Sequence, residues 1–286
     1  MKRFLILIMV VTVCATHSVK AWHQNIHAGI TSLVVANLTP ETKAAIADYL
    51  PNKNLLFYAN WHSFVELDDP YKQAAKWHHI AIDKNGGIMP VKKVAKSKCE
   101  LLSSALAYEG LSKAVATIKQ RSKHSKEEVA AAICFLTHIV IDLHCPTHYV
   151  YADMPVEERT PVYYVQKSKK SENYQSFWEF AALNNTFPWR AGEYCHQLNR
   201  KSAAEVQVLT AGTLEEWLKQ NAKEYRSIYD LVEPNVRFDK VGYRHWNNRI
   251  YPLVVEYIAT AGYRTAHLLN TLFDGNGVSA DTRSKK

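Results

Sequence analysis

The stretch "SKEEVAAAICFLTHIVIDLHCPTH", residues 125–148, combines a long apolar run with three histidines and one aspartate. Ser125 and Glu128 have the spacing of an N-terminal capping box, and Pro146 follows the end of the apolar run. These signals predict a helix over residues 125–144. On that helix His138 and Asp142 are four residues apart, so their side chains share one face.

A metal site is one interpretation of this stretch. The turn at Pro146 can bring His148 back toward the end of the helix, and imidazole and carboxylate groups are typical zinc ligands. His144 lies off the face of Asp142, so we expect it to have a structural role or to support a ligand. A buried histidine is more often a hydrogen-bonded core residue than a ligand, and a His-x-x-x-Asp pair alone is a weak indication of metal binding.

Helical patterns dominate the rest of the chain. Cap residues, apolar periodicity and bounding prolines predict further helices over residues 38–50, 213–232 and 251–273. In the last of these, Gly262 is expected where another element packs closely. Hydrophobic residues make up 47% of the chain and aromatic residues 11%, which excludes a disordered protein.

Two polar stretches interrupt the helical pattern. Residues 151–173 are predicted to form a long loop, and residues 83–90 are predicted to form a turn. We therefore expect residues 22–286 to form a single, multi-helix, all-α domain. Its core is expected to contain the tryptophans of the helical stretches, which are Trp61, Trp77, Trp178 and Trp217.

Residues 1–21 have the pattern of a signal peptide. Lys2 and Arg3 form a basic start, and the apolar run over residues 4–14 is too short to span a bilayer. Small residues precede a cleavage point after Ala21. No other apolar run is long enough to span a membrane, so we expect a secreted or periplasmic protein without stable membrane insertion.

The charge of the chain is basic, with a formal net charge of +8. Removal of residues 1–21 takes away three positive charges (Lys2, Arg3 and Lys20), and 8 − 3 leaves +5. A positive excess suits anionic partners such as nucleic acid or membrane headgroups, although a basic surface can equally serve solubility.

The four cysteines outside the signal peptide allow disulfide bonds in an exported protein. Four cysteines have three possible pairings, which the sequence does not rank. They lack the Cys-x-x-Cys spacing of a zinc knuckle. The residues are Cys99, Cys134, Cys145 and Cys195.

Further segments make the metal interpretation specific. Cleavage after Ala21 would make Trp22 the first residue, and its free amine and carbonyl could chelate a metal together with His27. "KWHHIAID" (76–83) contributes His78, "FLTHIVIDLHCPTH" spans residues 135–148, and the late segment "AGYRTAHLLN" spans residues 261–270. This set resembles the S1/P1 nuclease family, within the superfamily of zinc-dependent phospholipases C and P1 nucleases. The resemblance covers Trp22 to about Asn270.

The resemblance implies an all-α fold that holds three zinc ions at the bottom of a cleft. Asp142 would be the catalytic residue that bridges a close pair of ions. His78 and His138 would hold one ion of the pair, while the Trp22 amine and carbonyl and His27 would hold the other. Such a pair can activate a water and stabilise both oxygens of a phosphoryl displacement.

The third, separate ion would bind His148 and two residues of "NYQSFWE" (173–179). Gln175 stands where the family has a histidine, and Glu179 stands where it has an aspartate. Glu179 keeps the charge on a longer side chain, whereas Gln175 is a weak neutral ligand. We therefore expect two or three bound Zn²⁺ ions.

Two further positions depart from the family pattern. In "NWHSF" (60–64), Ser63 stands where the family has an aspartate ligand of the paired ions, and His62 or a water could substitute for it. His79 replaces the aromatic residue that stacks on a base beside the first histidine, and imidazole can still stack, so we assign it to substrate binding.

Three functions are compatible with these residues. The first is a monomeric, exported zinc endonuclease that hydrolyses single-stranded DNA or RNA and also 3′-nucleotides. The second keeps the metal centre but acts on a phospholipid, as the sister phospholipase C branch does. The third is a non-catalytic binding relative, and Ser63 and Gln175 are the substitutions that favour it.

Overall fold

The computed structural model describes residues 22–65, 69–154, 161–164, 171–184, 189–231 and 236–274. The predicted signal peptide lies outside these residues. Helices form most of the described chain, which confirms the prediction of an all-α fold. None of these helices combines the length and the apolar character that crossing a membrane requires.

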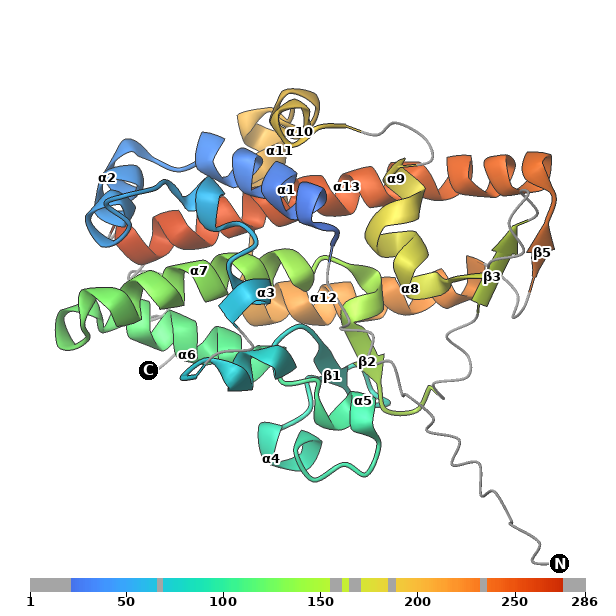
Figure 1. The fold of residues 1–286 in the computed structure, drawn as a ribbon, viewed down its shortest axis with the longest axis horizontal. Helices are drawn as coiled ribbons and strands as arrows, with labels where there is room; N and C mark the ends of the chain where they lie inside the picture. The colour runs from blue at the N-terminus through green and yellow to red at the C-terminus, as the bar shows by residue number, and fades with distance from the viewer. Residues whose placement is uncertain are drawn as a thin grey trace, which may run out of the picture.

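Helix α7 (Lys126–Asp142) lies in the middle of the protein. It packs against α6 (Ala107–Lys119), α1 (Gln24–Ala36), α2 (Pro40–Tyr49) and α13 (Lys240–Phe273) (Figure 1). Every residue from 131 to 142 is buried, so the helix is enclosed by its neighbours on all sides. A polar side chain in this part of α7 is therefore removed from bulk water.

The capping signals of the sequence predicted several helices correctly. The Ser125 hydroxyl accepts a hydrogen bond from the Glu128 N–H (3.1 Å), and the Glu128 carboxylate accepts one from the Ser125 N–H (2.8 Å). The same reciprocal pair joins Thr213 and Glu216 at the start of α12 (Leu214–Arg226). At α2, Thr39 is the N-cap residue and proline occupies the first turn.

The start of the last helix differs from the prediction. Helix α13 begins at Lys240, eleven residues before the predicted start, and Pro252 lies inside it. Asp239 caps this helix by accepting a hydrogen bond from the Gly242 N–H at 2.6 Å. A proline removes one helical hydrogen bond, but buried aromatic residues such as Tyr243 and Trp246 anchor the helix before it.

Short strands were the other feature that the sequence did not indicate. Strand β1 (Ile80–Ile82) pairs in parallel with β2 (Tyr149–Tyr151). Strand β3 (Pro161–Tyr164) pairs with β4 (Ser171–Asn173) and β5 (Arg237–Phe238). The predicted loop over residues 151–173 is therefore wrong where it includes the end of β2 and the strands β3 and β4, while residues 152–154 do form a turn. Strands of two to four residues are too short to show an alternating pattern.

The remaining elements are short helical segments that connect these helices and strands. They are η1 (Leu55–Tyr58), α3 (His62–Val65), η2 (Lys72–Lys76), α4 (Val91–Val94), α5 (Glu100–Ser103), η3 (Arg121–Lys123), η4 (Pro146–His148), α8 (Tyr174–Ser176), η6 (Phe177–Ala181), α9 (Ala182–Asn184), α10 (Ala191–Leu198), α11 (Ala203–Leu209) and η7 (Ser227–Leu231). Gly86 has φ +81° in the predicted turn at residues 83–90, and the Asp83 carboxylate accepts hydrogen bonds from the N–H groups of Asn85 and Gly87.

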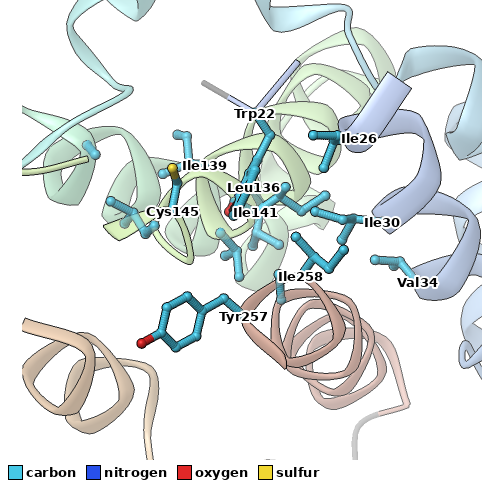
Figure 2. Close-up of a cluster of buried hydrophobic side chains, with 14 of the residues drawn as sticks. Trp22, Ile26, Ile30, Val34, Leu136, Ile139, Ile141, Cys145, Tyr257 and Ile258 are labelled. Atoms are coloured by element: carbon cyan, nitrogen blue, oxygen red, sulfur yellow. Dashed lines mark hydrogen bonds between the residues drawn. The ribbon is translucent and has the colours of Figure 1, made fainter. Parts of the chain in front are cut away.

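The core joins the first helix, the central helix and the last helix. Figure 2 shows Trp22 and Ile26 meeting residues of α7 such as Ile141, with Ile258 of α13 below them. The Trp22 side chain is only 2% exposed, so the residue that begins the described chain is part of the core. Three of the four tryptophans predicted to be buried are buried, and Trp61 is partly buried.

The predicted disulfide bonds are absent from the described part of the chain, which contains all four cysteines concerned. Cys99, Cys134, Cys145 and Cys195 are all free thiols. Burial raises the pKa of Cys134 to about 12, so this thiol behaves as a small apolar core group.

Gly262 provides a test of this packing. A Cβ atom at this position would lie 2.5 Å from Leu33 Cδ2 and 2.8 Å from Leu33 Cγ, so α1 and α13 approach each other there, as predicted. We expect Gly262→Ala to lower the free energy of unfolding by about 1–3 kcal/mol, because the core is overpacked. Urea denaturation measures this change. Gly192→Ala is the control, since a Cβ there meets nothing within 4 Å; equal effects of the two substitutions would contradict the close approach.

Candidate metal centre

Asp142, the last residue of α7, is fully buried and surrounded by imidazole rings. Its Oδ1 lies 2.9 Å from His27 Nε2. Its Oδ2 lies 2.8 Å from His78 Nδ1 and 3.4 Å from His138 Nε2. Three segments far apart in the sequence thus meet at one carboxylate.

Helices α1 and α7 position two of these rings. His138 precedes Asp142 by one helical turn and therefore lies on the same face. His27 lies on α1, whose first turn is capped by the His23 side chain. The rings of His27 and His138 are stacked, with nearly parallel planes and centroids 4.2 Å apart.

The β1–β2 pair brings two more histidine segments together. The parallel register places Ile80 opposite Tyr149, so the preceding residues His79 and His148 are also neighbours. Their rings stack at 4.5 Å, and His148 Nδ1 lies 2.6 Å from the carbonyl oxygen of His78. The short sheet therefore determines the position of the segment that carries His78 relative to His148.

A second polar group near this centre consists of Glu179, Gln175 and His148. Glu179 lies in η6, a π-helical turn between α8 and α9, an irregularity that is frequent at functional sites. Its Oε1 accepts a hydrogen bond from Gln175 Nε2 (2.6 Å) and lies 3.3 Å from His148 Nε2. The structure thus brings together the three residues that the resemblance assigns to a separate ion.

Trp22 lies between these two groups. Its indole Nε1 donates a hydrogen bond to the carbonyl of Ile141, the residue before Asp142, at 3.2 Å. The N–H of the next residue, His23, donates to the carbonyl of Glu179 at 3.1 Å. The indole of Trp22 is therefore held beside the end of α7, and the backbone that follows it is held beside Glu179.

His62 is a member of the centre that the sequence offered only as one alternative. It begins α3, is 1% exposed, and its ring lies 4.4 Å from that of His78 and 4.5 Å from that of His138. Ligand atoms of His62, His78 and His138 all lie within 4.8 Å of one another, as do those of His27, His138 and Asp142. We call these five residues the Asp142 cluster.

The cluster surrounds one buried carboxylate with imidazole rings. Burial opposes ionisation of Asp142, but contacts with His138, and then with His27 and His78, hold the pKa of its carboxyl well below the usual range. Burial, reinforced by the charge that His138 would carry, lowers the pKa of His27 to about 4. Burial and the neighbouring His138 and His78 also lower the pKa of His62 well below its usual value.

The pKa of Glu179 is shifted in the opposite direction from that of Asp142. Burial raises the pKa of its carboxyl, while the contacts with His148 and Gln175 oppose this rise. A buried carboxylate with this environment gains stability from any cation bound beside it.

The unpaired atoms of the Asp142 cluster fit a bound metal. Within the described residues, no hydrogen-bond partner is present for five buried atoms of the cluster, which are His27 Nδ1 and Nε2, His62 Nδ1, His138 Nε2 and Asp142 Oδ1. His27 Nε2 and Asp142 Oδ1 lie within contact distance, yet they are not aligned as a hydrogen bond. Buried polar atoms without partners are costly, and imidazole nitrogens with carboxylate oxygens are the ligands that zinc prefers.

The fold and the centre define a helical protein with a buried site suited to divalent metals. The family model described as S1/P1 Nuclease matches residues 22–274, which is most of the chain. The protein therefore belongs to the S1/P1 nuclease family, a group of zinc-dependent nucleases and phosphodiesterases. None of the curated proteins compared with the chain matches it.

The structure also places His144 and His79, two further histidines for which the sequence predicted a role. His144 is buried off the Asp142 cluster, and its Nδ1 contacts the carbonyl of Val140 at 2.8 Å. This is the structural position that the helix pattern indicated. His79 is only 5% exposed and stacks on His148, so its contact with a substrate base stays a prediction.

The lowered histidine pKa values predict the acid sensitivity of the metal-free protein. His27 and His144 have pKa values of about 4 and about 3 in the fold, against 6.5 in the unfolded chain. Between about pH 6.5 and pH 4 the unfolded state therefore binds protons that the folded state does not, and stability falls as the pH falls. Each histidine contributes about 2 kcal/mol of loss at pH 5. Glu179 has a raised pKa and therefore opposes this loss of stability, but it is one group against two histidines.

Urea denaturation after chelation measures this loss at pH 7, 6 and 5. We expect the free energy of unfolding to be at least about 2 kcal/mol lower at pH 5 than at pH 7. The His144→Asn variant should lose less, because it lacks one of the buried imidazoles. A stability that is constant over this range would show that these rings are not buried as neutral groups.

Proposed function

We propose that this protein is an exported, zinc-dependent endonuclease that hydrolyses single-stranded DNA or RNA and also acts on 3′-nucleotides. The observation that carries the proposal is the convergence of His27, His78 and His138 on the buried Asp142 carboxylate. Membership of the S1/P1 nuclease family supports nuclease or phosphodiesterase chemistry at this centre.

The residues divide into two groups of metal ligands. Asp142 would bridge two zinc ions through its two oxygens, with His78 and His138 on the Oδ2 side and His27 on the Oδ1 side. The amine and carbonyl of Trp22 would complete the site of His27; the bond from the Trp22 indole to the carbonyl of Ile141, next to Asp142, supports this assignment. The weaker set of His148, Gln175 and Glu179 would hold a third ion.

Bound zinc would lower the pKa of a coordinated water and stabilise the charge of a phosphoryl displacement. The protein supplies the conditions for this chemistry. Asp142 is ionised and buried, so its charge is available to cations at neutral pH. The imidazoles of His27 and His62 are neutral at that pH and therefore retain free lone pairs.

Two exposed aromatic residues that neighbour residues of the centre in sequence support a substrate with unpaired bases. Phe64 follows the His62 segment and is 63% exposed, and Phe180 follows Glu179 and is 38% exposed. Exposed aromatic rings can stack on bases that are free of a duplex, and such stacking tolerates any sequence. The net charge of +8 (+5 after cleavage) would favour a polyanion.

The proposal requires that cleavage after Ala21 creates the amino terminus at Trp22. The S1/P1 family model begins at residue 22, which supports this boundary. We infer that the protein acts as a monomer with a single domain over residues 22–286, secreted or in a periplasm, as is typical of extracellular members of the family.

An activity assay with an inactive variant tests the proposal. Protein expressed from the full-length sequence should cleave single-stranded DNA, RNA or a 3′-nucleotide, and lose this activity after chelation until zinc is restored. Asp142→Asn should lower kcat/KM at least about 100-fold, because the bridging charge is lost. Lys92→Gln, an exposed charge remote from the centre in sequence, is the control.

Other outcomes have defined meanings. Release of diacylglycerol from phosphatidylcholine vesicles without any nuclease activity would replace nucleic acid by a phospholipid as the substrate. Failure to cleave either substrate, with zinc present, would contradict the enzymatic role and favour a binding protein.

A variant of the amino terminus tests the assignment of Trp22. Insertion of one glycine between Ala21 and Trp22 should abolish zinc-dependent activity, because the α-amine then lies one residue away from its metal. The fold should persist, since the Trp22 indole can still bond to Ile141. Mass spectrometry confirms the terminus and circular dichroism the fold. Full activity of the extended protein would remove Trp22 from the ligand set.

A further inference from the structure

We propose that His62 is a metal ligand of the Asp142 cluster through its Nδ1 atom, forming a three-imidazole site with His78 and His138. The inference rests on the proposed metal centre and adds a ligand to it. The motivating observation is that His62 contributes a ligand atom within 4.8 Å of those of His78 and His138. Ser63, the next residue, has no imidazole or carboxylate to offer.

The hydrogen bonding of His62 determines which nitrogen is free. Its Nε2 lies 2.9 Å from the carbonyl oxygen of Ala74, which can only accept a hydrogen bond. Nε2 therefore carries the proton, and Nδ1 carries a lone pair. Nδ1 is buried and has no hydrogen-bond partner in the part of the chain that the structure describes, so a cation at this point would satisfy it.

His138 shows the same arrangement. Its Nδ1 lies 3.3 Å from the carbonyl oxygen of Ala59, which leaves Nε2 as the nitrogen with the lone pair, facing Asp142. Metal-bound histidines commonly donate their other N–H to a backbone carbonyl, which determines the tautomer and the ring orientation. Both rings are thus prepared as ligands by backbone carbonyls, that of Ala59, which follows η1, and that of Ala74 in η2.

Packing holds the His62 ring in place. Phe135 of α7 meets it edge-on at 5.0 Å, and the ring of His78 stacks on it at 4.4 Å. The side chain is 1% exposed, so it cannot rotate into solvent without disturbing this contact. The nitrogen is therefore preorganised toward the other two imidazoles.

The composition of this site predicts its metal preference. A set of three imidazoles with one shared carboxylate carries less negative charge than a set with two carboxylates. Imidazole ligands favour Zn²⁺, Co²⁺ and Ni²⁺, whereas Mg²⁺ and Mn²⁺ prefer oxygen ligands. We expect Zn²⁺ and Co²⁺ to be retained at His62 and Mg²⁺ to be excluded.

The His62→Gln variant tests whether His62 is a metal ligand or a residue that only supports the fold. Glutamine can place its amide nitrogen near the position of Nε2 and keep the bond to Ala74, but it offers nothing at the position of Nδ1. We expect the zinc affinity of the site formed by His62, His78 and His138 to fall by more than about 100-fold, as measured by competition with a chelator. Loss of a residue that only hydrogen-bonds to a metal ligand already lowers metal affinity by about 10–100-fold, and His62 would be a ligand itself.

His144→Asn is the matched control. It keeps a donor at the position that bonds Val140 and removes the other nitrogen of that ring, which is buried and has no partner among the described residues. Its zinc affinity should stay within about threefold of the wild type. Equal zinc affinity of His62→Gln and His144→Asn would overturn the inference.

A measurement on the wild type covers the case in which His62→Gln fails to fold. Zinc titration followed by NMR of ¹⁵N-labelled histidines should shift the Nδ1 resonance of His62; an unchanged Nδ1 resonance would overturn the inference. If the wild type binds zinc while the Nδ1 resonance of His62 does not shift, the proposed role of His62 is contradicted but the metal centre is not. If the wild type binds no zinc, the proposed metal centre falls with it.

Discussion

The structure depends on one buried charge. Asp142 has no exposed surface, yet its pKa is held well below the usual range, so it remains ionised within the core. A buried carboxylate is stable only if positive charge or hydrogen-bond donors surround it. His27, His78 and His138 are brought to it from α1, the segment before β1, and α7. The need to compensate this charge therefore connects the sequence over more than a hundred residues.

The scaffold around Asp142 explains how such distant residues meet. Helix α7 is buried over its last three turns, so its carboxyl end can present Asp142 without contact with solvent. The parallel β1–β2 pair brings the histidines at 78, 79 and 148 to one edge. Trp22 closes the arrangement, because its indole bonds to α7 while the following N–H bonds to the π-helical turn that carries Glu179.

Much of this was predictable because local signals and the tertiary fold agree. The capping boxes at Ser125 and Thr213 indicated the helix starts, and the spacing of His138 and Asp142 indicated their shared face. The early start of α13 was missed because Pro252 has the appearance of a helix beginning. The β1–β2 pairing was missed because three-residue strands show no period, and the position of His62 depends on that long-range packing.

The central claim is that these converging side chains form a metal centre. The most direct measurement is anomalous X-ray diffraction at the zinc absorption edge from crystals of the purified protein. The account predicts strong anomalous peaks within coordination distance of both oxygens of Asp142, one near His78 and His138 and the other near His27 and Trp22. A map without anomalous density at Asp142, from protein grown and purified with zinc, would contradict it.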